Sequence, residues 1–202
     1  MALTDDLLRS AFFDMFGDPV TNPKGWQQTK FGDLIDTLTD YHANGSYQIL
    51  KQHVDLKNEE DFALMIRTTD LEAEEFNVGV KWIDQHAYDF LKKTKVFGGE
   101  IIINKIGSAG AVYLMPNLNR PVSLAMNQFM IRCNTKIDNV FAYHFLKTTA
   151  AEREIKSRVQ GAVTKTITKD AVRDIPFYCP PKEEQEKFIK AARKIRVTGI
   201  SG

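Results

Sequence analysis

The segment that most constrains the fold is ITKDAVRDIPFYCPPKEEQEKF, residues 167–188. A short apolar stretch at 175–179 has the composition of a buried strand, and Pro180 and Pro181 end it abruptly. A helix tolerates a proline at its start, because the fixed φ and the missing N–H cost nothing in the first turn. The charged residues that follow therefore predict a helix over 182–195. Its apolar stripe consists of Phe188, Ala191, Ala192 and Ile195.

A second amphipathic helix is predicted near the N-terminus, over residues 3–16, where apolar residues recur at helical spacing. The glycines and prolines of residues 17–26 then break the chain. We expect a leading helix at 1–17, a globular domain at 18–180, the start of a further helix at 181–197 and a tail at 198–202. The two helices can pack against each other or against another chain. The residues expected at this interface are Leu7, Ala11, Phe12, Phe188, Ala192 and Ile195.

Between the two helices, strands and helices are predicted to alternate without a strict βαβ rhythm. The expected elements are a strand at 62–71, a helix at 84–93, two β-arms within 100–115, a strand at 123–133 and a helix at 138–159. Asp84 and Asp138 are the expected N-caps of the two helices. The pattern predicts an α+β fold, in which a mixed-sheet domain is bracketed by the amphipathic helices.

Composition limits the domain size and the cellular location expected for the chain. Its 202 residues, 43% of them apolar, can bury a core of ordinary size in one domain or little more. No apolar run approaches the roughly 18 residues that span a membrane, and the acidic start lacks the order of a signal peptide. The two cysteines, Cys133 and Cys179, are too few for a disulfide framework. We therefore expect a cytoplasmic protein with no membrane partner.

The charges are unevenly distributed, although the net charge is only +1. Residues 54–76 hold eight acidic and two basic side chains, whereas residues 147–173 hold seven basic and three acidic ones. Such runs are usually solvated faces. The second run is compatible with a nucleic-acid surface but does not establish one.

Catalytic signatures are missing from the sequence. There is no GxxxxGK[ST] phosphate loop and no GxSxG nucleophile motif, and GSAG at 107–110 is typical of a tight turn. The histidines show no ligand pairing, so we expect neither a metal nor a cofactor. Two acid-x-Lys pairs, Asp55 with Lys57 and Glu154 with Lys156, fit a metal-dependent nuclease but occur often by chance. The sequence thus predicts a protein that is not an enzyme.

Several segments, in order and spacing, resemble the specificity subunit of type I restriction–modification systems. The segments are FFDMFGDPVTNPKGW (12–26), MIRTTDL (65–71), GGEIIINKIGSAG (98–110), MNQFMIRCN (126–134) and GAVTKTITKDAVRDIPFYCPPKEEQEKF (161–188). The resemblance covers residues 8–195. It implies a subunit without an active site whose target recognition domain reads one half of a bipartite double-stranded DNA sequence.

The resemblance also implies partners. The conserved helices of such subunits act as a ruler and as the docking surface for the methyltransferase (modification) subunits, and the complex includes a restriction and translocase subunit. The family usually has two recognition domains in about twice this length. The single domain here implies either a half-subunit, forming a homodimer through its terminal helices, or a fragment.

DNA recognition needs side chains that reach base edges, together with cations and small donors for phosphates. The candidates lie in predicted loops, at strand ends and in the basic segment. They are Tyr41, Asn44, Ser46, Tyr47, Arg67, Thr68, Thr69, Lys105, Ser108, Lys156, Arg158, Gln160, Thr164 and Lys165. Two other hypotheses stay open: an assembly or regulatory module that does not read DNA, and the metal-dependent nuclease.

Overall fold

The computed structural model describes residues 2–200, and side chains from Thr4 to Ile195. The chain divides into two compact units, each described by itself. Unit 1 comprises the residues up to Asp36, Cys133–Val159 and those from Thr168 onward. Unit 2 comprises Thr37–Arg132 and Gln160–Ile167. The range 18–180, predicted as one domain, thus contributes to both units.

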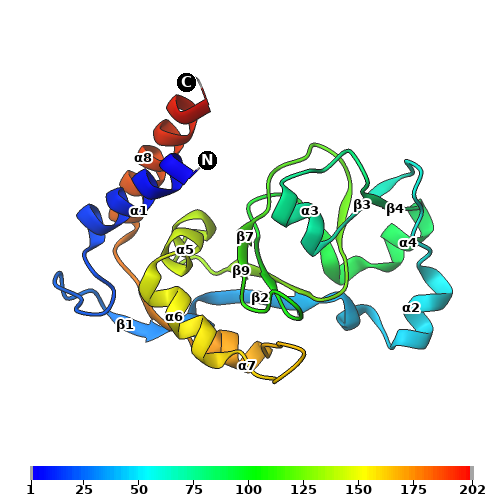
Figure 1. The fold of residues 1–202 in the computed structure, drawn as a ribbon, viewed down its shortest axis with the longest axis horizontal. Helices are drawn as coiled ribbons and strands as arrows, with labels where there is room; N and C mark the ends of the chain where they lie inside the picture. The colour runs from blue at the N-terminus through cyan, green and yellow to red at the C-terminus, as the bar shows by residue number, and fades with distance from the viewer. Residues whose placement is uncertain (1, 201–202) are drawn as a thin grey trace. The chain divides into compact units, whose positions relative to one another are not determined.

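The elements are labelled in chain order (Figure 1). Unit 1 holds α1 (Ala2–Phe16), β1 (Gln28–Lys30), η1 (Phe31–Leu34), α5 (Asn139–Leu146), α6 (Thr149–Arg158), α7 (Lys169–Arg173), β10 (Pro176–Tyr178) and α8 (Lys182–Ile200). Unit 2 holds η2 (Tyr41–Asn44), α2 (Tyr47–His53), β3 (Ala63–Ile66), α3 (Thr68–Ala73), β4 (Lys81–Ile83), α4 (Gln85–Phe90), η3 (Lys92–Thr94), β5 (Lys95–Val96), β6 (Ile101–Asn104), β7 (Val112–Leu114) and β8 (Val122–Leu124). Most residues of β2 (Ile35–Asp40) and β9 (Gln128–Cys133) also belong to unit 2.

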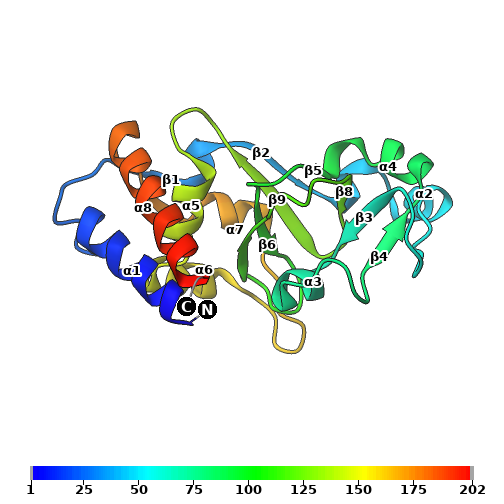
Figure 2. The same ribbon diagram turned by 90° about the horizontal axis from the view of Figure 1, so that it is seen from above.

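The core of unit 1 is a cluster of aromatic rings between three helices. Helices α1 and α8 lie side by side and antiparallel (Figures 1 and 2), and α5 contacts both. The Phe12 ring lies 4.9 Å from that of Phe16, 5.5 Å from Phe141 and 5.3 Å from Phe188, measured between centroids. All four side chains are buried. The apolar stripes of the two terminal helices are therefore buried against each other within the chain.

One buried side chain, that of Gln185, holds the corner between strand β10 and helix α8. Strand β10 pairs antiparallel with β1, and the chain turns at Pro180 before α8 begins. The fully buried Gln185 amide donates to the Pro180 carbonyl at 2.8 Å and to the Lys136 carbonyl at 3.1 Å. Its oxygen accepts from the Asp138 N–H at 2.9 Å. Gln185 thereby joins the strand–helix corner to the start of α5.

Unit 2 is built on two four-stranded sheets. Their strand orders are β2-β9-β6-β7 and β4-β3-β8-β5. Strands β3 and β8 are parallel, whereas β4 and β5 pair antiparallel at the two edges of the same sheet. Strands β3 and β6 are buried along their whole length, which their runs of leucine, methionine and isoleucine explain. The mixed sheets and the flanking helices confirm the predicted α+β class.

Three predicted elements differ from the observed ones, since two are split and one ends early. The helix expected at 138–159 is two helices, because Thr148 caps α6 through the Ala151 N–H at 3.3 Å. The strand expected at 62–71 ends at Ile66, where α3 follows. The strand expected at 123–133 is split by Asn127, whose φ of +71° makes a turn between β8 and β9.

Along residues 2–200, no helix combines the length and the apolar character needed to cross a membrane.

Candidate nucleic-acid interface

Four segments of unit 2, three loops and the start of α3, lie at one end of its sheets, and we call them the loop end. They are residues 67–69 after β3, 105–110 between β6 and β7, 125–127 between β8 and β9, and 160–167. Because β3 and β8 are parallel, the segments that follow them leave the sheet at the same edge. Backbone hydrogen bonds join the loops to one another: Lys105 N–H to Asn127 at 2.7 Å, Gly107 N–H to Lys165 at 3.2 Å, and Ile167 N–H to Lys105 at 3.0 Å.

A hollow of about 330 Å³ opens at the loop end. Its lining residues are Tyr41, Leu56, Met65, Arg67, Thr68, Thr69, Ala125, Met126 and Asn127. The Tyr41 ring is mostly buried, and this burial raises the pKa of its phenol. The structure therefore brings together four of the predicted contacts, Tyr41, Arg67, Thr68 and Thr69, around one hollow.

Two predicted cations of the loop end already have acidic partners inside the unit. Arg67 forms two side-chain hydrogen bonds with the buried Asp70, at 2.5 and 3.1 Å. The Lys105 ammonium lies 3.1 Å from Asp40, and both side chains are largely shielded from solvent. Lys105 also lies over the Phe129 ring, 5.6 Å from its centroid. Both cations thus contribute to the unit's own structure.

Some hydroxyl groups of the loop end form hydrogen bonds within unit 2, whereas others are exposed to solvent. Thr68 donates to Asn104 at 3.1 Å. Ser108 donates to Glu72 at 2.8 Å, and this carboxylate disfavours an approaching phosphate. Thr69 is exposed beside the hollow.

The segment 160–167 forms a narrow turn. Gln160 and Thr166 exchange two backbone hydrogen bonds of 2.8 Å each. Past Gln160 the chain is exposed up to Lys165, and Val163 at the tip is 96% exposed. Lys165 forms no ion pair among the side chains described between Thr4 and Ile195. It is therefore the predicted cation of the loop end that can meet a phosphate without losing an internal partner.

Gly161 fixes the shape of this turn, and Gly161→Ala is expected to destabilise it. The residue has φ of +102°, and an added Cβ would lie 2.1 Å from the Thr164 carbonyl oxygen. The strained backbone alone costs about 1–3 kcal/mol, and the collision adds to this. Hydrogen exchange at the Gln160 and Thr166 amides, which pair across the turn, measures the loss.

Gly79→Ala is the matched control, because φ there is +68° but an added Cβ meets no atom within 4 Å. Equal protection of the Gln160 and Thr166 amides in both variants would contradict the expected collision.

Residues 41–47, which hold four of the predicted DNA contacts in a segment expected to be a loop, form η2 and the start of α2. Asn44 donates to the Thr94 hydroxyl at 2.9 Å and accepts from the Lys93 N–H at 3.0 Å. Ser46 is the N-cap of α2 and accepts from the Ile49 N–H. Asn44 and Ser46 thus shape the backbone, whereas Tyr47 is 63% exposed.

Helix α2 also carries exposed residues that were not predicted as contacts: Gln48, Lys51 and Gln52. Asn44 and Gly45, a pair typical of turns, come directly before the helix, so the sequence pattern indicated a loop there. The helical spacing of Leu50 and Val54, one apolar position per turn, is the signal that could have indicated the helix.

The remaining predicted DNA contacts, Lys156 and Arg158, belong to α6 of unit 1. The Arg158 guanidinium hydrogen-bonds the Glu154 carboxylate at 2.6 Å and lies 3.7 Å from Asp174. Lys156 is exposed.

The predicted partner interface is partly internal, which requires a correction. Phe12, Phe188 and Ala192 are at most 2% exposed, so they hold the α1–α8 pair together and offer no surface to a partner. Ala11 and Ile195 are half-buried, and Leu7 is 51% exposed. Among the side chains of α1 that the structure describes, the exposed large apolar ones are Leu7 and Phe13, which is 41% exposed.

Part of the acidic segment 54–76 is engaged within unit 2. The Lys57 ammonium, 2.5 Å from Asp61, lowers the pKa of that carboxyl. Backbone N–H groups of Asn77 and Val78 lower the pKa of Glu75. Because Lys57 pairs with Asp61, its ammonium is not free for the metal-dependent nuclease site considered with Asp55. Among the described residues no three His, Cys, Asp or Glu side chains are grouped to hold a metal.

Comparison with known proteins gives a family match and a fold match. A family model described as the type I restriction modification DNA specificity domain matches residues 23–192. No curated protein matches the chain. The crystal structure of the HsdS subunit from Thermoanaerobacter tengcongensis is 16% identical at a TM-score of 0.62, over 98% of this chain and 44% of that one.

Two further solved structures agree. One, from work on complex assembly and conformational transition of the type I R-M system, is 14% identical at a TM-score of 0.66, over 98% of this chain and 45% of that one. The S subunit of a type I system from M. genitalium is 16% identical at a TM-score of 0.50, over 82% and 38%. These likenesses show a shared fold, and the chain spans less than half the length of each structure.

Proposed function

The chain belongs to the family of type I restriction–modification DNA specificity domains, and on that premise we propose that unit 2 recognises a specific sequence of double-stranded DNA. The family makes the chain a specificity module and not an enzyme, as the sequence predicted. The chemistry is then carried out by other subunits of the complex.

One structural observation supports DNA recognition by unit 2. Backbone hydrogen bonds join three segments of the loop end, and the Ala125 N–H bonds the Ile66 carbonyl at 2.9 Å, directly before the fourth segment, so the exposed polar groups are held in place before any ligand arrives. Such preorganisation lowers the entropic cost of binding. Thr69, Thr164 and Lys165 are exposed there, and Lys165 supplies the positive charge that a phosphate requires.

The partners follow from the same proposal. We propose that unit 1 docks on the modification subunits, and through them on the restriction and translocase subunit, using the exposed Leu7 and Phe13 of α1. The chain spans 44% and 45% of two solved structures that it resembles, so a second copy of the chain and a further part of a longer subunit both stay open as the source of the other half of the recognition surface. The free thiols of Cys133 and Cys179 suit a cytoplasmic location.

Selection from a library of random-sequence duplexes tests the proposal, with the chain bound to its modification subunits. We expect a short preferred sequence, bound more tightly than the unselected pool. Normal complex formation without any preferred sequence would instead establish the assembly module that does not read DNA.

Lys165→Gln is expected to weaken binding to every duplex to a similar extent. Each neutralised phosphate releases counterions, so the slope of log affinity against log salt should fall by about 0.9. Fluorescence anisotropy titrations at several salt concentrations measure the slope. Lys190→Gln, at an exposed lysine of α8, is the control and should leave it unchanged. An unaltered slope for Lys165→Gln would remove Lys165 from the interface.

A further inference from the structure

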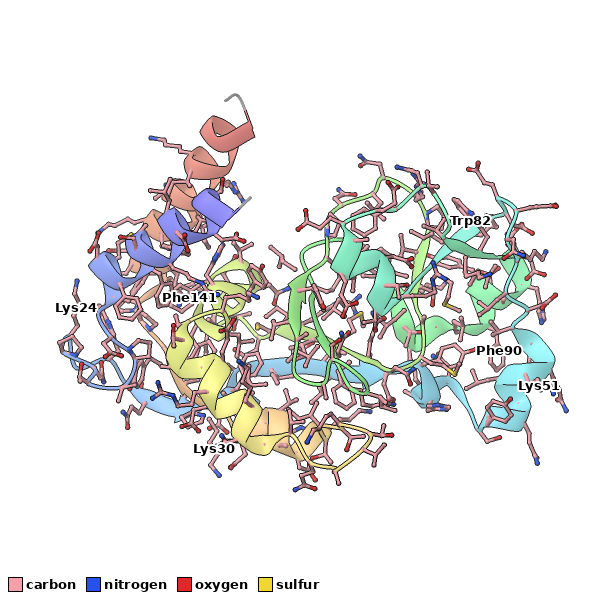
Figure 3. All side chains as sticks on the ribbon, in the orientation of Figure 1. Lys24, Lys30, Lys51, Trp82, Phe90 and Phe141 are labelled. Carbon is pink, nitrogen blue, oxygen red and sulfur yellow. The ribbon has the colours of Figure 1, made fainter. Side chains whose placement is uncertain are left out.

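Helix α2 presents a stripe of three polar side chains on the face opposite its buried side. Leu50, 1% exposed, anchors the helix in a core cluster that also contains Tyr41, Met65 and Ala125. Gln48, Lys51 and Gln52 are all exposed and stand at positions i, i+3 and i+4, so they share one face. We call them the α2 stripe. Figure 3 shows Lys51 on the outer side of the helix.

The α2 stripe differs in composition from an ordinary solvated helix face. Exposed helix faces commonly pair carboxylates with lysines three or four residues apart. Helix α2, with the sequence YQILKQH, contains no carboxylate, and the acidic residues begin only at Asp55 after its end. Lys51 forms no ion pair within the described part of the chain. The stripe therefore presents two side-chain amides and one ammonium that no described carboxylate pairs with.

The helix is held rigidly despite its length of seven residues. Ser46 caps its start, and the His53 ring stacks on Phe90 of α4 at 4.2 Å between centroids. Nδ1 of His53 lies 3.0 Å from Nε2 of His86, at hydrogen-bonding distance. Contacts at both ends thus fix the direction in which the stripe faces.

Two further cations lie on η3, which is bonded to the segment before the helix. Lys92 and Lys93 of η3 are exposed, and neither forms an ion pair in the described residues. Asn44, just before α2, accepts from the Lys93 N–H, which ties η3 to the helix start. These two lysines supply positive charge suited to a phosphate backbone on an element tied to the segment that leads into α2.

We propose that α2 is the element of unit 2 that enters the major groove, where Gln48 and Gln52 read adenines and Lys51 reads a guanine. This inference rests on the proposed function and names the residues behind its specificity. A glutamine amide can donate to N7 and accept from N6–H₂ of adenine, and a lysine donates to O6 and N7 of guanine. An α-helix with its side chains is about 10–12 Å across, which fits a groove about 12 Å wide.

The spacing on the helix sets the expected footprint. Side chains at i and i+4 are about 5–6 Å apart at their Cβ atoms, and successive bases rise about 3.4 Å. Gln48 and Gln52 should therefore contact base pairs one or two steps apart. The stripe should control two or three consecutive positions of the preferred sequence and no others.

The test repeats the duplex selection with a Gln48→Ala and Gln52→Ala double variant, bound to the modification subunits. Both side chains are exposed and alanine favours helix, so the fold should persist. We expect discrimination to fall at least tenfold at two or three adjacent positions, with the rest of the preferred sequence retained. Affinity for unselected duplexes should change less than twofold.

Gln27→Ala, at an exposed glutamine of unit 1, is the matched control and should keep the full preference. A second variant, Gln52→Glu, should replace a preference for adenine by one for cytosine, because a carboxylate accepts from cytosine N4. The same preferred sequence from all the variants would overturn the role of α2 and leave the proposed function standing. No preferred sequence from the unaltered chain would overturn both.

Discussion

Phe12→Ala is expected to lower the free energy of unfolding of unit 1 by about 3–5 kcal/mol, the usual cost of removing a buried phenylalanine. Phe12 is 2% exposed, and its ring contacts those of Phe16, Phe141, Phe145 and Phe188. Figure 3 marks Phe141 within the helices that enclose this cluster. Alanine would leave a cavity lined by rings of α1 itself, α5 and α8.

The chain allows each unit to be followed separately, because it has two tryptophans, one in each unit. Trp26 of unit 1 donates to the Phe16 carbonyl at 3.0 Å, next to the aromatic cluster. In a Trp82→Phe background, its fluorescence during urea unfolding therefore reports on unit 1.

Phe13→Ala is the control, since the same residue type at the next position of α1 is 41% exposed. It should change stability by about 0.5 kcal/mol, as surface substitutions usually do. Equal effects of the two substitutions would mean that α1 does not pack on α8 as described.

Lys105→Glu is expected to destabilise unit 2 by at least about 3 kcal/mol, because removing one partner of a shielded ion pair leaves the other uncompensated. The new carboxylate would also face Asp40, which lies 3.1 Å from the Lys105 ammonium. Trp82 fluorescence in a Trp26→Phe background reports on this unit. Adding Asp40→Asn should restore part of the lost stability by removing the repulsion.

This result bears on how DNA-binding data are interpreted. From the sequence, Lys105 and Lys165 are equally good phosphate contacts, but a loss of binding in Lys105→Glu would reflect unfolding of the loop end. Lys165→Glu should cost only about 0.5 kcal/mol of stability, since Lys165 is exposed. A Lys105→Glu chain as stable as the unaltered one would show that the pair with Asp40 contributes nothing.

The sequence predicted best what depends on neighbouring residues. Asp84 and Asp138 cap α4 and α5 as expected, through the Ala87 and Val140 N–H groups. The β6–β7 hairpin lies within the range predicted for its two arms. These features follow from local hydrogen bonds and turn geometry, which a sequence displays directly.

What could not be predicted depends on residues far apart in the chain. The Lys105–Asp40 pair joins positions 65 residues apart. The sequence therefore does not distinguish an exposed lysine from one in a shielded ion pair. The burial of Phe12 and Phe188 likewise depends on whether two distant helices meet within the chain or between chains. Helix α2 was missed because seven residues give too few turns for periodicity to stand out.

The way unit 1 is assembled from separated stretches has a consequence for synthesis on the ribosome. Its aromatic cluster needs Phe12 from the beginning, Phe141 from the middle and Phe188 near the end of the chain, whereas Thr37–Arg132 of unit 2 is continuous. Domains fold as their residues emerge from the ribosome. The sheets of unit 2 can therefore form before α8 is synthesised, while the aromatic rings of α1 are still exposed to solvent. A nascent chain arrested before Phe188 would expose the apolar face of α1, which is the kind of surface that chaperones bind.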